Sequence, residues 1–85
     1  MSAILNTYNR KKVAFTKGKG SFLYGTNGKK YLDFVQGIAV NCLGHANNYL
    51  INSISKQSKK LWHVSNAFII PEQERLAKRL KQKTF

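Results

Sequence analysis

The clearest pattern of hydrophobic and polar residues consists of two short runs on either side of Asn27-Gly28. Residues 21–26 and 29–34 are rich in aromatic and aliphatic side chains, which is typical of β-strands. Asn-Gly supplies the positive φ that both central positions of a type I′ turn require. The pattern therefore predicts an antiparallel β-hairpin with a two-residue turn.

A two-residue turn also fixes which residues of the hairpin lie opposite one another. In that register Tyr24 faces Tyr31 and Leu23 faces Leu32. Both faces of the hairpin are then partly apolar, and an isolated hairpin is unstable in water, so we expect other parts of the protein to cover it. One face carries Leu23, Leu32 and Phe34, and the other carries Phe22, Tyr24 and Tyr31.

A helical period follows the hairpin. Apolar residues recur at helical spacing over about 47–62, and Asn47 or Asn48 is a plausible N-cap. This pattern predicts one amphipathic helix with most of its lysines off the apolar stripe. The stripe consists of Leu50, Ile51, Ile54, Leu61 and Trp62.

A second helix is predicted over about 71–83. Pro71 suits the first helical turn, where its missing N–H removes no hydrogen bond. Acidic residues lie near the predicted N-terminus and basic residues near the C-terminus, as the helix dipole favours. The acidic pair is Glu72 and Glu74, and the basic pair is Lys81 and Lys83.

The remaining segments have no sustained period. Residues 1–17 are expected to form an extended, basic arm, and residues 35–45 are rich in small side chains that let the chain turn or let another group approach the backbone. Phe85 follows no helix C-cap or closing element. The fold class is therefore α/β, consisting of an arm, a hairpin and two helices, and we expect an incomplete domain.

Composition limits the surroundings in which the protein works. With 85 residues, a core made by this chain alone would be marginal. Cys42 is the single cysteine, so no disulfide framework stabilises the fold and a reducing compartment is expected. No apolar run approaches the length of a signal peptide or a membrane span. We expect a cytoplasmic, soluble protein.

The charge balance raises a second kind of partner. Fifteen Lys and Arg against three Asp and Glu give a formal net charge of +12. Such a surplus is typical of nucleic-acid-binding proteins, so a small basic nucleic-acid-binding module is the alternative hypothesis. The cations are spread over every segment instead of forming one arm or one stripe, which favours solvated surface lysines.

Most catalytic constellations are missing from the sequence. The three acidic residues do not provide a carboxylate pair of the glycosidase kind. Cys42, His45 and His63 lack the paired spacing of a metal site, and nothing marks the thiol as an activated nucleophile. Gly18-Lys19-Gly20 is not a Walker phosphate loop. The residues taken alone therefore predict an incomplete α/β segment without visible chemistry of its own.

The order of short motifs carries further information, because it extends over nearly the whole chain. The string closely resembles the opening segment of acetylornithine aminotransferases, in the ornithine/GABA aminotransferase subgroup of the type I pyridoxal-phosphate fold. Each motif is weak alone, and the specificity comes from their order and spacing. The motifs are residues 8–10 (YNR), 17–21 (KGKGS), 28–34 (GKKYLDF), 37–41 (GIAVN), 43–45 (LGH), 63–66 (HVSN) and 71–77 (PEQERLA).

This resemblance implies a fold and an activity. In the family, the segment is an N-terminal arm with a small antiparallel sheet and helices, which packs on a large cofactor-binding domain and on the partner of a homodimer. The implied reaction transfers an amino group between N-acetylornithine and 2-oxoglutarate in arginine biosynthesis, with pyridoxal 5′-phosphate as cofactor. Another omega-amino-acid aminotransferase of the same subgroup remains an alternative.

The resemblance also implies which residues contact substrate. Tyr8 matches a tyrosine that helps to hold the substrate, and Gly37 and Ile38 match a loop that shapes the substrate pocket. Arg10 and Asn66 are expected to line the same cleft. No catalytic or cofactor-binding residue is assigned within the chain, because the family's Schiff-base lysine, pyridinium-binding aspartate and phosphate-binding loop all follow this segment. Residues 1–85 alone are therefore expected to be inactive, with the large cofactor-binding domain absent.

Overall fold

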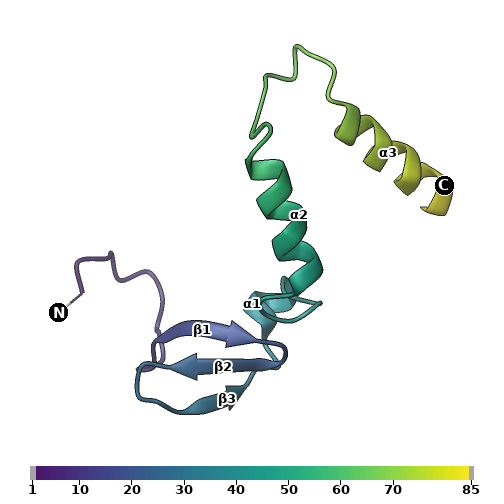
Figure 1. Cartoon of the computed structure of the whole chain (residues 1–85). Helices are drawn as coiled ribbons and strands as arrows, with labels where there is room; N and C mark the ends of the chain where they lie inside the picture. The colour runs from purple at the N-terminus through teal and green to yellow at the C-terminus, as the bar shows by residue number, and fades with distance from the viewer. Residues whose placement is uncertain (1, 85) are drawn as a thin grey trace. The chain divides into compact units, whose positions relative to one another are not determined.

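The computed structural model describes residues 2–84 of a chain that divides into two compact units, Met1–Asn52 and Ser53–Phe85. The first unit contains a small sheet and a short helical turn, and the second contains most of the remaining helical residues (Figure 1). In chain order the elements are β1 (Phe15–Lys19), β2 (Phe22–Gly25), β3 (Lys30–Leu32), α1 (Gln36–Ala39), α2 (Asn48–Ser58) and α3 (Pro71–Thr84).

The sheet has three antiparallel strands in the order β1-β2-β3, one more than the predicted hairpin. The additional strand, β1, begins within the expected extended arm and continues into the Gly18-Lys19-Gly20 stretch. Its pairing with β2 places Lys17 opposite Tyr24 and Gly18 opposite Leu23. Periodicity did not reveal β1 because Phe15 is its one apolar residue, so the strand is defined by its partner and not by its own pattern.

The hairpin between β2 and β3 forms as predicted, but the predicted two-residue turn is wrong. The loop has three residues: the Gly25 N–H donates to the Lys29 carbonyl oxygen at 2.9 Å, and the Gly28 N–H donates to the Gly25 oxygen at 3.1 Å. Gly28 has a φ of 78°, and the Asn27 side-chain oxygen accepts from the Lys29 N–H at 3.0 Å. A turn closed by a left-handed glycine is the usual form of a three-residue hairpin loop.

The longer loop shifts the register by one residue, so the predicted composition of the two faces is also wrong. Leu23 now lies opposite Tyr31, and Phe22 lies opposite Leu32. On the face of Leu23, the Phe15 and Tyr31 rings meet edge to face, with centroids 5.4 Å apart. On the other face, the Lys30 ammonium lies 4.0 Å from the centre of the Phe22 ring, and the Lys17 ammonium lies 5.1 Å from that of Tyr24.

Both long helices begin where the sequence predicts. The Asn47 side-chain oxygen accepts from the Leu50 N–H at 3.1 Å, so Asn47 is the N-cap of α2. α2 ends at Ser58, four residues earlier than predicted, because the chain turns when the N–H groups of Lys60 and Leu61 both donate to the Gln57 carbonyl oxygen. α3 begins at Pro71 and extends one residue past the predicted end, to Thr84.

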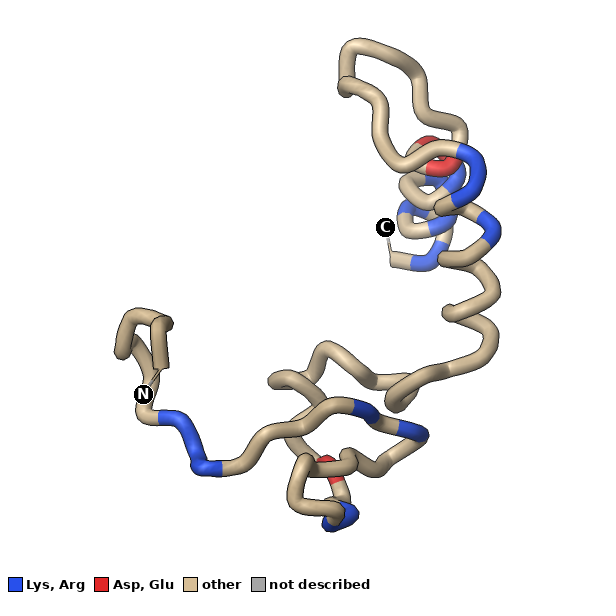
Figure 2. The backbone as a smooth tube through the Cα atoms, turned by 60° about the vertical axis from the view of Figure 1, so that its left-hand side comes forward, with Lys and Arg blue, Asp and Glu red and all other residues tan. Residues whose placement is uncertain are grey.

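The described residues form no buried hydrophobic core. Even β2, the middle strand, is half-buried, and most large apolar side chains are exposed. Lysine and arginine are spread over the arm, the hairpin and both long helices instead of gathering in one segment (Figure 2). No helix among residues 2–84 has the length and apolar character needed to cross a membrane. The apolar surface therefore lacks the cover that the two-faced hairpin was expected to need.

Candidate functional site

The candidate site is built around the loop formed by residues 33–45, which both starts and ends at the turn between β1 and β2. At its start, the Asp33 N–H donates to the Ser21 carbonyl oxygen at 2.8 Å. At its end, His45 and Gly20 exchange two backbone hydrogen bonds of 2.8 and 3.0 Å. The sheet thus fixes both ends of loop 33–45, although most of its residues have no regular partner strand.

The middle of the loop, α1, has an uncommon backbone conformation. Its four residues, Gln36–Ala39, have φ values of 57°, 65°, 63° and 62° in succession. The turn is closed by hydrogen bonds from the Val40 and Asn41 N–H groups to the Gln36 carbonyl oxygen, both of 2.9 Å. A non-glycine residue costs about 1–2 kcal/mol in the left-handed conformation, and three of the four residues are not glycine. Such strain persists only where the surroundings hold it, and it is frequent at ligand-binding sites.

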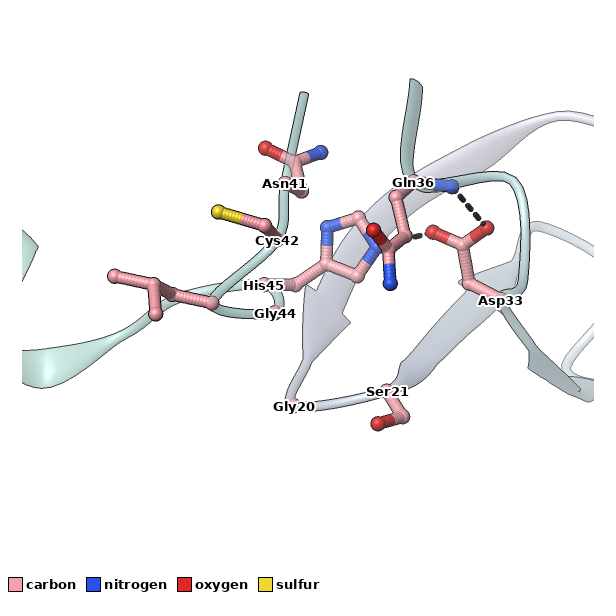
Figure 3. Close-up of a pocket in the computed structure, with 9 residues that line it drawn as sticks. Gly20, Ser21, Asp33, Gln36, Asn41, Cys42, Gly44 and His45 are labelled. Carbon is pink, nitrogen blue, oxygen red and sulfur yellow. Dashed lines mark hydrogen bonds and ion pairs between the residues drawn. The ribbon is translucent and has the colours of Figure 1, made fainter. Parts of the chain in front are cut away.

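The Asp33 carboxylate joins the two ends of the loop (Figure 3). One oxygen accepts from the N–H groups of Val35 and Gln36 at 3.0 and 2.9 Å, and the other accepts from His45 Nε2 at 2.7 Å. The Asp33 and His45 side chains are 6% and 19% exposed. The hydrogen bond from the Gln36 N–H, followed by that from His45, lowers the pKa of Asp33 below its ordinary value, because both stabilise the ionised carboxylate.

Two glycines allow the end of the loop to lie directly against the sheet. A Cβ on Gly18 would lie 2.6 Å from Cγ of His45, so the imidazole rests on bare backbone. Gly44 has a φ of 82°, and a Cβ there would lie 2.9 Å from the carbonyl oxygen of Gly20. Any side chain at either position would displace His45 or the β1–β2 turn.

Two cavities adjoin this loop. One, of about 250 Å³, is small and mainly polar, and it includes Asp33, Gln36, Cys42 and His45 among its walls (Figure 3). The other, of about 540 Å³, is mainly apolar. It lies against the sheet face that carries Phe15, Leu23 and Tyr31, and Gly37 lies at its edge on the loop side. The strained turn therefore borders a groove of a size that suits a small molecule.

The structure places the predicted substrate residues in separate positions. Tyr8 and Arg10 line one shallow cavity on the arm, and Gly37 lines the apolar groove. Ile38 is 85% exposed, and Asn66 lies between α2 and α3 in the second unit. Phe15 contributes to the cavity of the arm and to the groove. The substrate roles of these five residues stay predictions.

Sequence reasoning missed the roles of Asp33 and His45. It considered His45 as a metal ligand and counted Asp33 as one of few acidic residues, and it otherwise used both residues as parts of family motifs. An aspartate directly after a strand is typical of a capping side chain. Its carboxylate accepts hydrogen bonds from the backbone N–H groups two and three residues further along the chain. In the part of the chain that the structure describes, no three His, Cys, Asp or Glu residues are grouped as a metal site would need.

A small antiparallel sheet followed by helices agrees with a known class of protein. Residues 4–85 match the family model of class-III aminotransferases, and the chain belongs to this family. Among solved structures, N-acetylornithine aminotransferase from Stenotrophomonas maltophilia has a similar fold: the TM-score is 0.79 at 34% identity, over 89% of this chain and 21% of that one.

Curated relatives point to the same subgroup. The chain is 52% identical, over its full length, to acetylornithine aminotransferase from Rhodobacter capsulatus, of which it covers 22%. It is 54% identical over 76 residues to acetylornithine aminotransferase from Oceanobacillus iheyensis, covering 89% of this chain and 19% of the relative. The chain thus spans about a fifth of the length of the relatives it matches. The family resemblance and the expected sheet with helices are confirmed.

Proposed function

We propose that this chain forms part of an aminotransferase that moves an amino group between N-acetylornithine and 2-oxoglutarate, a step of arginine biosynthesis. The observation that carries the proposal is the 52% identity over all 85 residues to a relative named acetylornithine aminotransferase. The match covers the whole chain, including the arm, the loop and the helices. Every candidate site residue therefore lies within the matched region. A cytoplasmic location and a homodimer belong to the same proposal.

The chain's own contribution is to bind and orient substrate. Tyr8 and Arg10 line one cavity, and together they offer a hydroxyl donor and a cation, which suit the carboxylate of an amino acid. Gly37 and Ile38 offer no polar side-chain group at the turn, so they suit an uncharged part of the substrate. Asn66 supplies an amide that donates and accepts hydrogen bonds from the second unit.

The described residues do not fit a pyridoxal 5′-phosphate site by themselves. The cofactor supplies the electron sink for transamination and requires a lysine that is shielded from water. Every lysine between residues 2 and 84 is exposed. The two carboxylate oxygens of Asp33 already accept from two backbone N–H groups and His45, so this carboxylate is not free to pair with a pyridinium nitrogen. Cofactor binding is therefore proposed for the whole enzyme and not for these residues.

A chimera tests the proposed function. In the chimera, residues 1–85 of this chain replace the matching segment of the Rhodobacter capsulatus relative. We expect the chimera to transfer the amino group of N-acetylornithine to 2-oxoglutarate with a kcat/KM within about tenfold of the relative, because the exchanged segment is expected to line the cleft in the same way. The measurement is steady-state kinetics with each amino donor.

The controls separate folding from substrate choice. The relative itself is the positive control, and cofactor absorbance reports whether the chimera is loaded. A chimera that folds and binds cofactor but prefers a different omega-amino acid would assign the chain to another member of the subgroup. A loaded chimera with no transaminase activity on any such donor would contradict the proposal.

A pH prediction follows from the lowered pKa of Asp33. Because the folded-state value lies below the unfolded one, ionised Asp33 stabilises the fold at pH values above the ordinary carboxyl pKa of about 4. This contribution is lost as the pH falls through the lower, folded-state pKa. We expect D33N to lower the Tm of the chimera at pH 6–7, and we expect this effect to diminish as the pH falls below about 4 and through the folded-state pKa of Asp33. An equal Tm difference at all pH values would show that the charge of Asp33 is irrelevant.

A further inference from the structure

The left-handed turn Gln36–Ala39 is not held by apolar packing within the described residues. Ile38 is 85% exposed, and Val35 and Val40, which flank the turn, are exposed as well. Four successive positive φ values nevertheless require a restraint, because each non-glycine residue would relax to a more favourable conformation. Hydrogen bonds are the remaining source of that restraint within this unit.

One side chain supplies the restraint at the start of the turn. Asp33 accepts hydrogen bonds from the N–H groups of Val35 and Gln36, the two residues that lead the chain into the left-handed conformation. Both bonds use the same carboxylate oxygen, Oδ1. The orientation of the Asp33 carboxylate therefore sets the direction in which the turn begins.

The orientation of Asp33 depends in turn on His45. The Nε2 atom of His45 donates to Oδ2 of Asp33 at 2.7 Å. His45 is itself fixed, because its backbone exchanges two hydrogen bonds with Gly20 and its ring lies against the backbone of Gly18. A continuous chain of contacts thus leads from the sheet through His45 and Asp33 to the turn.

We propose that Asp33 and His45 are positioning residues, whose hydrogen-bonded pair holds the turn Gln36–Ala39 in the shape that sets substrate selectivity. This inference rests on the proposed function, since it assigns the turn to the substrate cleft. Asp33 and His45 also line the groove, and the role proposed for them is to hold the turn, not to bind the substrate. They act through the backbone of the turn, in which Gly37 lines the groove.

The Asp33–His45 pair is expected to affect substrate selectivity because of the side chains that Gly37 and Ile38 carry. Gly37 has no side chain and Ile38 has an apolar one, so the turn offers shape and no charge. An acylated amine is neutral and tolerates such a wall, whereas the free ammonium of ornithine would lose hydration without gaining a partner. A loosened turn admits water and reduces this discrimination, without removing any group that transfers a proton.

The test uses the chimera with substitutions at the two positioning residues. D33A removes every side-chain acceptor, and H45A removes the donor. H45Q is the conservative variant, since its amide nitrogen can donate to Asp33 from a similar position. N47A is the matched control, because it removes a helix-capping hydrogen bond outside loop 33–45. The readout is the ratio of kcat/KM for N-acetylornithine to that for ornithine.

We expect the ratio to fall about 10- to 100-fold in D33A and H45A, mainly through a higher kcat/KM for ornithine, because a displacement of about 1 Å in a binding element has effects of this size. H45Q is expected to recover most of the ratio. N47A is expected to lower the Tm and to leave the ratio unchanged. Loaded D33A and H45A chimeras with the parent's ratio would overturn the inference.

A second readout needs no substrate and separates this inference from the proposed function. Crystal structures of the chimera and its D33A variant report φ for Gln36, Ile38 and Ala39 directly. We expect positive φ at all three in the parent and loss of this conformation in D33A. If the parent lacks activity on N-acetylornithine, the proposed function fails while these angles still decide the role of Asp33. An unchanged turn in D33A would contradict the inference whatever the activity.

Discussion

Replacing Gly44 with alanine in the chimera is expected to lower the free energy of unfolding by about 2–4 kcal/mol, the largest effect of any single methyl group in loop 33–45. Two causes add. The φ of 82° is unfavourable for alanine, and the new Cβ would lie 2.9 Å from the carbonyl oxygen of Gly20. Since that oxygen accepts from the His45 N–H, relieving the clash breaks the contact that closes the loop. Urea unfolding followed by fluorescence measures the change.

Gly20→Ala is the matched control for this prediction. Gly20 also has a positive φ, 58°, but an added Cβ would have no atom within 4 Å. Its alanine variant carries conformational strain alone, which is about 1–2 kcal/mol. We expect G44A to be clearly less stable than G20A and to lose more selectivity for N-acetylornithine. Equal stability of the two variants would show that the loop does not close against the turn as described.

The second large effect concerns the chain by itself. Residues 1–85 in isolation are expected to show no cooperative unfolding transition, because the described residues bury no hydrophobic side chain. A three-stranded sheet that is apolar on both faces and lacks cover is at best marginally stable. Circular dichroism during heating, together with the spread of amide proton resonances, measures the degree of order. The chimera is the control, and it is expected to melt in one sharp transition.

A cooperative unfolding transition of the isolated chain would contradict this prediction. A sharp two-state transition at micromolar concentration, in a monomer shown by sedimentation, would mean that the apolar faces are covered within the chain. Transition midpoints that rise with concentration would instead show that copies of the chain cover one another. The first result would contradict the expectation that the apolar surface needs further protein. The second would contradict only the expected lack of a cooperative transition, because a second copy would then supply the cover.

The elements that sequence predicted well are those whose signals are local. The start of α2 depends on the Asn47 cap and the start of α3 on Pro71, and both are correct. The hairpin was predicted, but its register was not, because Asn-Gly is compatible with a two-residue and with a three-residue loop. The Asn27 side chain, which accepts from the Lys29 N–H, accompanies the longer loop.

The candidate site was harder to predict because its determinants are far apart in the sequence. β1 forms through its pairing with β2, and its own residues carry no strand pattern. Asp33 and His45 are twelve residues apart, and they meet because Gly20 bonds to the backbone of His45. The residue preferences of Gln36, Ile38 and Ala39 do not predict their positive φ values. Family resemblance pointed to Gly37 and Ile38, whereas only the structure showed how the turn that contains them is held.

The central claim is that this chain supplies part of the substrate cleft of a class-III aminotransferase. A crystal structure of the chimera with bound N-acetylornithine tests it most directly. We predict atoms of Tyr8 and of the Gly37–Ile38 turn within about 4 Å of the substrate, the distance of direct contact. A complex in which the substrate is contacted entirely by residues outside this chain would contradict the claim.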